Sequence, residues 1–170
     1  QNGSAFHADR FKRVHELIVQ LYRTDARWDD VYNDVQTTPD ATARTVRRKR
    51  RPPHTGHIER GHYASEDGGP RLMRSVIYAP NCHGRATHPT EKPVGILEIL
   101  IRTSCPPDGL VGDWFAGSGA AGEAARATGR RYLGCEIDAD MAARADARIA
   151  AVLPFGGVPL ASDPHFGDLP

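Results

Sequence analysis

The chain has 170 residues, a formal net charge of +1, three cysteines and 39% hydrophobic residues, which suit one domain with a modest core. No apolar run comes near the roughly 20 residues that a membrane helix needs, and the first residues lack the charged-then-apolar pattern of a secretory leader. We therefore expect no membrane partner. Because the cysteines are odd in number and lack paired spacing, we also expect a protein of the reducing cytoplasm.

A strand is predicted from Glu16 to Arg23, because the branched apolar run Leu17–Tyr22 is typical of a core strand. A helix from Asp9 to Leu21 is the alternative, since the apolar side chains in that range also satisfy helical spacing. We predict that residues 1–24 form a first segment that ends in this strand.

Residues 25–87 are rich in turn signals, and only Leu72–Tyr78 resembles a strand there. The same region carries a basic block, in which six cationic side chains fall within eight residues and no acid intervenes: Arg44, Arg47, Arg48, Lys49, Arg50 and Arg51. Such a block is usually a solvated loop, and it is also suited to contact the phosphates of a nucleic acid.

Several histidines and one cysteine between residues 54 and 88 are potential metal ligands: His54, His57, His62, Cys82, His83 and His88. Their spacing matches no common zinc module, and the sequence has no closely spaced pair of cysteines. We therefore predict no metal site.

From residue 88 to residue 153 the sequence alternates between helical and strand patterns, which predicts one structural unit. Its first helix is predicted after Pro93, with an apolar stripe made of Val94, Leu97, Leu100 and Ile101. Residues 154–170 are rich in proline and glycine, and we predict that they form a loose tail.

The centre of this unit has the order strand, turn, helix, strand. Leu110–Trp114 is predicted as a buried strand, and Gly117 and Gly119 allow the tight turn that follows it. Ala120–Thr128 is predicted as a helix and Tyr132–Ile137 as a second strand. This order is typical of the nucleotide-binding half of a doubly wound α/β fold, with a ligand expected at the carboxyl ends of the strands.

The glycine-rich turn fits two classes of adenosine cofactor. Gly117–Gly122 matches the dinucleotide fingerprint, and Glu136 stands where that fingerprint places its ribose-binding acid. Asp113 separates the classes by charge, because a pyrophosphate is an anion whereas the methionine part of S-adenosyl-L-methionine (SAM) carries an ammonium group. We favour SAM, and a nicotinamide cofactor is the alternative.

Two segments together carry a family resemblance: His88–Pro93, with the sequence HPTEKP, and Asp113–Gly119, with DWFAGSG. In this order, with a helix between them, they resemble the DNA amino-methyltransferases of the N4-cytosine and N6-adenine type, in their beta arrangement. The resemblance covers roughly residues 12–150. It implies a Rossmann-like α/β SAM-dependent methyltransferase fold, which is partial here because the strands of the catalytic half are missing.

The resemblance also implies which residues hold the cofactor. In the family, the segment matching Thr90–Pro93 flanks the methionine end, the segment matching Asp113–Gly119 cradles the cofactor, and the acid matching Glu136 binds the ribose hydroxyls. The implied residues of this chain are Thr90, Lys92, Asp113, Phe115, Gly117, Ser118, Gly119 and Glu136. Structural roles are the alternatives: Thr90 as a helix N-cap, Lys92 as a surface lysine, and Glu136 as an acid beside a helix N-terminus.

The chain departs from the family at several positions. Trp114 stands where the family usually has proline, and Ala120-Ala121 stands where it has hydroxylated residues. The Asp-Pro-Pro-Tyr-type tetrapeptide, which accepts the amino hydrogens and stacks on the extruded base, has no counterpart, because neither Pro52-Pro53 nor Pro106-Pro107 has the required neighbours. We assign no catalytic residue and expect an N-terminal catalytic segment or a partner chain to supply this part.

The remaining segments take their assignment from the same resemblance. Residues 1–24 are similar to the end of the catalytic half, and residues 25–87 fall where the family often houses target recognition. We therefore expect residues 25–87, and the basic block above all, to contact double-stranded DNA, as in a restriction–modification methyltransferase. Without the catalytic-half strands, Leu110–Trp114 should have one unpaired edge.

Two other functions are compatible with the sequence. One is a nicotinamide-linked oxidoreductase fragment, and the other is a DNA-binding remnant without catalytic activity. The sequence does not distinguish adenine from cytosine as the target base.

Overall fold

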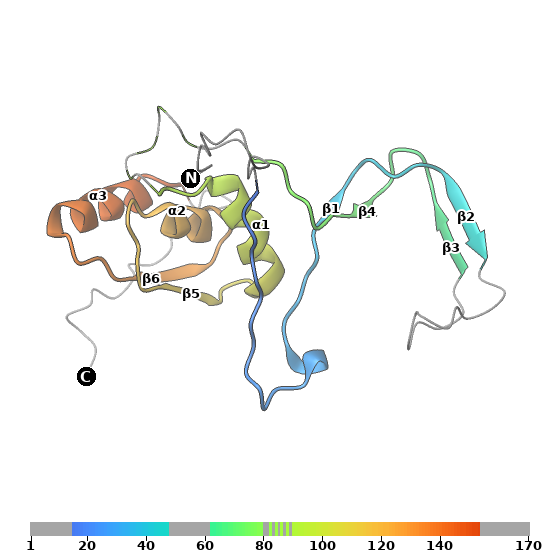
Figure 1. Cartoon of the computed structure of the whole chain (residues 1–170), viewed down its shortest axis with the longest axis horizontal. Coiled ribbons are helices and arrows are strands. Elements are labelled where there is room, and N and C mark those ends of the chain that lie inside the picture. The colour runs from blue at the N-terminus through green and yellow to red at the C-terminus, as the bar shows by residue number, and fades with distance from the viewer. Residues whose placement is uncertain are drawn as a thin grey trace, which may run out of the picture. The chain divides into compact units, whose positions relative to one another are not determined.

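The computed structural model describes residues 15–47, 62–79, 82, 84, 86, 88 and 90–153. The chain divides into two compact units (Figure 1). Val35–Ile77 forms one, which we call the ribbon unit, and the rest of the chain forms the other, which we call the core unit. The ribbon unit covers fewer residues than the predicted recognition region of residues 25–87. The predicted tail of residues 154–170 lies outside the described residues.

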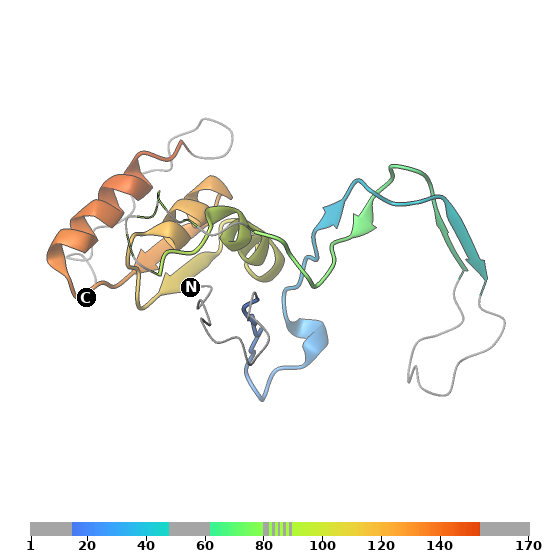
Figure 2. The same ribbon diagram turned by 45° about the horizontal axis from the view of Figure 1, so that its top comes forward.

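The ribbon unit consists of two short antiparallel ribbons, one nested within the other in sequence (Figures 1 and 2). Strand β1 (Thr37–Thr38) pairs with β4 (Arg71–Leu72), and β2 (Arg44–Arg47) pairs with β3 (His62–Ser65). The strand predicted from Leu72 to Tyr78 is therefore wrong beyond its first residue, since regular pairing ends at Leu72.

Polar contacts hold the ribbon unit together. The Asp67 carboxylate accepts a hydrogen bond of 2.8 Å from the Ala43 amide, and the Ser65 hydroxyl donates one of 2.7 Å to the Thr42 carbonyl. Ala41 is the one buried side chain among the residues of this unit whose burial is described. The described part of the unit thus has no hydrophobic core of its own.

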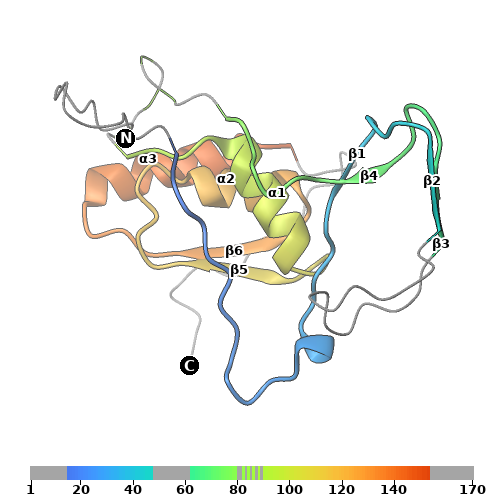
Figure 3. The same cartoon turned by 45° about the vertical axis from the view of Figure 1, so that its right-hand side comes forward.

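The core unit contains a parallel two-stranded sheet, in which β5 (Leu110–Asp113) pairs with β6 (Arg131–Gly134). Three helices lie on the same side of this sheet (Figure 3): α1 (Val94–Ser104), α2 (Ala120–Ala127) and α3 (Ala139–Ala150). A short 3-10 helix, η1 (Trp28–Asp30), belongs to the same unit. This arrangement confirms the predicted α/β class and the partial Rossmann-like fold.

The core lies between the helices and the sheet. Ile101 of α1 and the alanines Ala124 and Ala125 of α2 are buried there, and Val111 of β5 and Tyr132 of β6 pack against them. The methyl side chains let α2 lie close to the sheet, as the sequence predicted. By contrast, Leu110 is 53% exposed, because it points to the sheet face that no described helix covers.

Two glycines of the turn and of α2 are required by close packing. A Cβ atom at Gly119 would lie 2.9 Å from the Cβ of Ala145 in α3, and Gly119 also has a φ angle of +75°. A Cβ atom at Gly122 would lie 2.8 Å from the Tyr132 ring and would collide with the Ile149 side chain. Both positions therefore exclude larger residues while α2, α3 and β6 keep this arrangement.

The predicted elements of the core unit differ from the observed ones mainly at their ends. The first strand ends at Asp113, and α2 ends at Ala127. The second strand ends at Gly134, so Glu136 follows the strand by two residues. Helix α1 begins at Val94 with Pro93 at its N-cap position, so the alternative that Thr90 caps this helix is wrong.

The strand predicted from Glu16 to Arg23 is wrong. Residues 15–23 have no regular secondary structure, and the rival helix is not formed in its described part either. The apolar side chains are largely exposed, with Leu17 at 85% and Leu21 at 86%. The composition favours a strand, but a strand needs a neighbour to pair with, and the described residues provide none.

The other edge of β5 is also unpaired within the described residues, because β6 is its only neighbour there. The open edge of Leu110–Trp114 stays a prediction. No helix in that part is long and apolar enough to cross a bilayer.

Candidate cofactor site

The glycine-rich turn directly follows β5 and leads into α2. Its start is fixed by Asp113, whose Oδ1 accepts a hydrogen bond of 3.0 Å from the Phe115 amide. Gly117 and Gly119 have φ angles of +51° and +75°, which side chains rarely adopt. The Gly119 amide closes the turn with a bond of 2.8 Å to the Ala116 carbonyl.

Glu136 is brought onto this turn from the other strand. Its Oε2 accepts a hydrogen bond of 2.7 Å from the Gly117 amide, and its Oε1 accepts one of 3.1 Å from the Asp138 amide. The amides of Asp138 and Gly117 lower the pKa of the Glu136 carboxyl, so it is a carboxylate at neutral pH. Two residues that the sequence singled out separately are therefore in direct contact.

Asp113 is held from its other side by Tyr132. The Tyr132 hydroxyl donates to Asp113 Oδ2 at 3.4 Å. Burial and the nearby Asp113 charge raise the pKa of Tyr132, so its hydroxyl stays protonated and remains a donor. The carboxylate at the end of β5 is thus oriented by a backbone amide and by a phenol.

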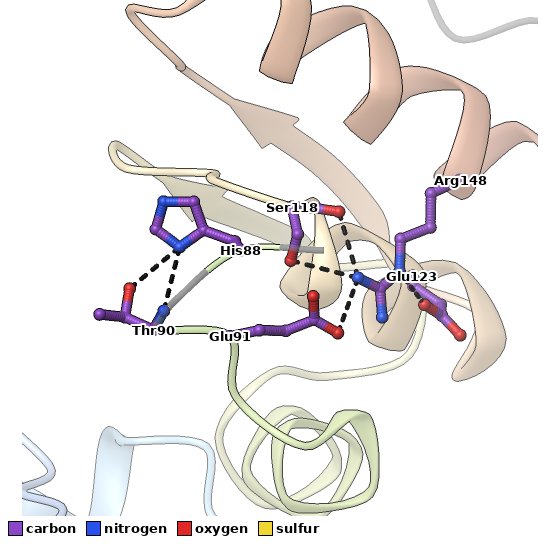
Figure 4. A network of polar contacts seen from close by, with 6 residues as sticks. All are labelled: His88, Thr90, Glu91, Ser118, Glu123 and Arg148. Atoms are coloured by element: carbon purple, nitrogen blue, oxygen red, sulfur yellow. Dashed lines mark hydrogen bonds and ion pairs between the residues drawn. The ribbon is translucent and has the colours of Figure 1, made fainter. Parts of the chain in front are cut away.

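The segment around Thr90 lies beside the same turn. The His88 ring is 3.8 Å from the position that a Cβ atom on Gly117 would occupy. Thr90 is tied to that ring, because its amide and its hydroxyl oxygen lie 3.3 Å and 3.0 Å from His88 Nδ1 (Figure 4). The two signature segments therefore meet in space.

Arg148 of α3 connects these segments (Figure 4). Its Nη1 lies 3.1 Å from Glu91 Oε1 and donates to the carbonyl and hydroxyl oxygens of Ser118, at 3.3 Å and 3.1 Å. Its Nε bonds to Glu123 Oε2 of α2. Burial opposes the charge of the guanidinium, yet Glu123 and Glu91 together keep the pKa of Arg148 above its ordinary value.

The remaining predicted cofactor residues are exposed. Lys92 Nζ forms an ion pair of 2.8 Å with Glu16 Oε2, and this ammonium lowers the pKa of Glu16. Phe115 is 90% exposed in the turn. Ile137, which follows Glu136, is fully exposed, and no periodic pattern in the sequence singled it out.

Two of the six predicted DNA-contacting residues lie in the β2–β3 ribbon. Arg44 and Arg47 are the first and last residues of β2, and Arg44 is exposed. The other four residues of the basic block lie outside the described residues: Arg48, Lys49, Arg50 and Arg51. The same is true of His54, His57 and His83.

Sequence reasoning found the turn and Glu136 but missed the network around Arg148. Its members come from α2, α3 and the segment before α1, and nothing in the local pattern pairs Glu91 or Glu123 with an arginine of α3. Ser118 was predicted as a cofactor residue, yet its side chain is buried and bonded to Arg148.

Comparison with known proteins identifies the family of the chain. Residues 1–146 match the profile of a family described as DNA methylase, of the N6 and N4 type. The chain therefore belongs to the N6/N4 DNA methylase family. This finding confirms the family resemblance inferred from the sequence, at the level of the family.

Individual relatives match parts of the chain. The putative methylase YubD of Escherichia coli (strain K12) is 45% identical over 106 residues, which cover 58% of this chain and 45% of YubD. The type II methyltransferase M1.MboII of Moraxella bovis is 41% identical over 56 residues, which cover 33% of this chain and 22% of M1.MboII. The chain thus spans less than half the length of either relative.

Among solved structures, the M1.HpyAVI–SAM complex matches with 24% identity and a TM-score of 0.41. That match covers 62% of this chain and 44% of M1.HpyAVI.

Proposed function

We propose that this chain is the SAM-binding and DNA-recognition portion of a DNA methyltransferase that modifies the exocyclic amine of adenine or cytosine. The contact between Glu136 and Gly117 carries the proposal, because it joins a ribose-binding carboxylate to a glycine turn at the carboxyl ends of parallel strands. Membership of the N6/N4 DNA methylase family supports it.

The charges of the site fit SAM. Each oxygen of the Glu136 carboxylate accepts one backbone hydrogen bond, and a carboxylate has about four acceptor positions, so both oxygens can also accept from ribose hydroxyls. Asp113 is a fixed negative charge at the end of β5, which attracts the ammonium of a methionine moiety and repels a pyrophosphate. This difference favours SAM over a nicotinamide dinucleotide.

The exposed apolar groups fit the adenine ring. Phe115 lies two residues after Asp113 in the turn and Ile137 directly follows Glu136, so both side chains are within two residues of a carboxylate of the site. Both are almost completely exposed, and covering them with an aromatic ring would stabilise the complex by about 25 cal/mol per Å² of apolar surface. Thr90 and Lys92 would lie toward the methionine end.

The reaction needs few groups from this portion of the enzyme. SAM, when bound, supplies a methyl group activated by its sulfonium. The target amine would accept this methyl group and give up one of its protons. This chain holds and orients the donor, while a catalytic segment or partner chain with an Asp-Pro-Pro-Tyr-type motif supplies the acceptor for the amino hydrogens and the platform for the extruded base.

The ribbon unit is the proposed DNA contact. Antiparallel two-stranded ribbons are narrow enough to enter the major groove of B-DNA. Strand β2 carries Arg44 and Arg47 and leads into the rest of the basic block, Arg48–Arg51. We propose that this block neutralises phosphates of double-stranded DNA and thereby positions the enzyme on its target.

Isothermal titration calorimetry with SAM, its demethylated product and NAD tests the proposal. We expect both SAM and its product to bind and NAD not to bind. Glu136→Gln, which removes the proposed ribose-binding charge, should weaken SAM binding. Glu98→Gln removes a carboxylate from α1 instead; it is the matched control and should leave SAM binding unchanged. NAD binding without SAM binding would instead support an oxidoreductase, and salt-dependent DNA binding with neither cofactor would support a remnant without activity.

A further inference from the structure

Arg148 is the point at which both signature segments are joined. Glu91 stands between Thr90 and Lys92 in the HPTEKP segment, and Ser118 stands between the two glycines of the turn. One guanidinium bonds to both (Figure 4), and Glu123 holds it from α2.

The network is largely shielded from water. The Glu91 side chain is 7% exposed and the Arg148 side chain 24%, and Ser118 as a residue is 6% exposed. Hydrogen bonds to charged groups are stronger in such surroundings than at an exposed surface, and a buried carboxylate is costly without its partner. These contacts therefore fix the positions of the two segments.

The base of the network is rigid. Helices α2 and α3 are in close contact where Gly119 meets Ala145. Arg126 of α2 adds a second link, since its Nε donates to the Val152 carbonyl just beyond α3, at 2.9 Å. Arg148 thus extends from a fixed helix pair toward segments that have no regular secondary structure.

We infer that Arg148 is a positioning residue for the methyl donor: it sets the separation between the HPTEKP segment and the glycine turn. This inference rests on the proposed function. Arg148 acts through Glu91 and the Ser118 backbone, without contacting the donor itself.

Arginine is specifically suited to this task. Its planar fork presents several N–H groups in fixed directions, so one side chain can bond to Glu91, Glu123 and Ser118 at once. A lysine would keep the charge but would concentrate it at one nitrogen, and it would not hold all three partners in the same geometry.

The two ends of SAM should depend on Arg148 to different degrees. The adenosine end relies on Glu136, which contacts the turn through Gly117 without Arg148. The methionine end, by contrast, lies between the two segments that Arg148 joins. Loss of Arg148 should therefore weaken binding of SAM more than binding of adenosine, which lacks the methionine part.

The experiment compares Arg148→Met with Arg148→Lys, and uses Arg126→Met as the matched control because it also removes a guanidinium that links α2 to the end of α3. Calorimetry gives the affinities for SAM and for adenosine, and thermal unfolding gives the stability of each variant. We expect Arg148→Met to lower SAM affinity by about tenfold or more and adenosine affinity by less than about threefold, with Arg148→Lys in between. Arg126→Met should lower the melting temperature and leave both affinities within about twofold of wild type.

Several outcomes would overturn the inference. If Arg148→Met lost affinity for SAM and for adenosine equally, Arg148 would have a role in stability alone. The same conclusion would follow if Arg126→Met also lost affinity for SAM more than for adenosine. If Arg148→Met does not fold, Glu91→Gln replaces it, since it removes the charge of the HPTEKP segment that Arg148 contacts; an unchanged SAM affinity in that variant contradicts the inference.

The same titrations separate this inference from the proposed function. Wild-type protein that binds SAM, together with an Arg148→Met variant that binds it equally well, removes only the role of Arg148. If the wild-type protein binds adenosine and SAM with equal affinity, the proposed SAM site is wrong, and the inference about Arg148 is wrong with it.

Discussion

The core unit and the ribbon unit are stabilised by different interactions. In the core unit, Ile101, Ala124 and Ala125 are buried between α1, α2 and the sheet. In the described part of the ribbon unit only Ala41 is buried, and the contacts are hydrogen bonds and an exposed ion pair between Arg71 and Asp40. Short two-stranded ribbons without a packed face are marginally stable in water.

The two units are therefore suited to different tasks. Hydrogen bonds within the core unit hold the glycine turn, Asp113 and Glu136 of the proposed cofactor site in place. The ribbon unit exposes its polar groups and cations, and water competes for its hydrogen bonds. It is suited to gain order from a charged partner rather than from its own interior.

The largest effect that the comparison predicts is at Gly122. In Gly122→Val the new side chain meets Tyr132 at 2.8 Å and the Ile149 side chain, so α2 and α3 must separate. We expect the free energy of unfolding of the core unit to fall by about 3 kcal/mol. Urea denaturation followed by circular dichroism measures this loss.

Gly95→Ala is the control for that substitution. Gly95 also lies in a helix, but nothing is within 4 Å of the position that its Cβ would occupy. Alanine there should raise the stability by about 0.5–1 kcal/mol through its higher helix propensity. If both variants lost stability equally, close packing of α2 against α3 would not be what holds the core unit.

Within the core unit, hydrogen exchange can distinguish the paired edge of β5 from its other edge. The Arg131 amide donates to the Gly109 carbonyl, and the Cys135 amide donates to the Asp113 carbonyl. In a parallel pair of strands, every second residue of β5 directs its amide and its carbonyl toward β6. The Val111 amide therefore faces β6 and the Gly112 amide faces the open edge. We expect the Val111 amide to exchange about a hundredfold more slowly than the Gly112 amide.

Equal, strong protection of the Val111 and Gly112 amides would mean that another strand covers the open edge of β5. Addition of a catalytic segment or partner chain should slow exchange at Gly112 selectively, because only that amide needs a new acceptor.

Glu136→Gln tests the proposed cofactor site. The variant keeps the shape of the side chain but loses the charge that accepts from Gly117 and from the proposed ribose hydroxyls. We expect SAM affinity to fall by about tenfold, since hydrogen bonds to charged groups contribute about 1.5–3 kcal/mol. Calorimetry measures the change, and an unchanged affinity would place the cofactor elsewhere.

The stabilities of the wild-type protein and of Glu136→Gln should depend differently on pH. The pKa of Glu136 in the folded chain lies below its ordinary value of 4.5, so its stabilising contribution is fully present above that pH. It is lost as the pH falls through the lowered pKa. The stability difference between wild type and Glu136→Gln should therefore shrink in acid, which urea denaturation along a pH series measures.

The smallest effect is predicted in the ribbon unit. Arg44→Ala should weaken binding to duplex DNA by a modest factor and reduce the slope of log K against log salt by about one unit. Arg144→Ala, which removes an exposed cation from α3, is the control of equal charge. Equal changes in both slopes, measured by fluorescence anisotropy, would argue against a DNA contact at β2.

Sequence patterns predicted the elements of the core unit well. The apolar run before Asp113, the two turn glycines and the alanine-rich stretch are local signals, and each leads to the element that it favours. The prediction failed at Glu16–Arg23, where the run has the composition of a strand but stays exposed. A strand depends on a partner distant in sequence, which composition does not report.

By itself, the sequence determined the match over residues 1–146 that places the chain in the N6/N4 DNA methylase family, and the order of strand, turn and helix. That order follows from local backbone preferences and from the spacing of apolar residues. Only the tertiary structure decided that Glu136 contacts Gly117 and that Arg148 joins Glu91 to Ser118. The physical reason is that charged side chains find their partners across the fold, where packing of α2 and α3 sets the distance and local pattern has no influence.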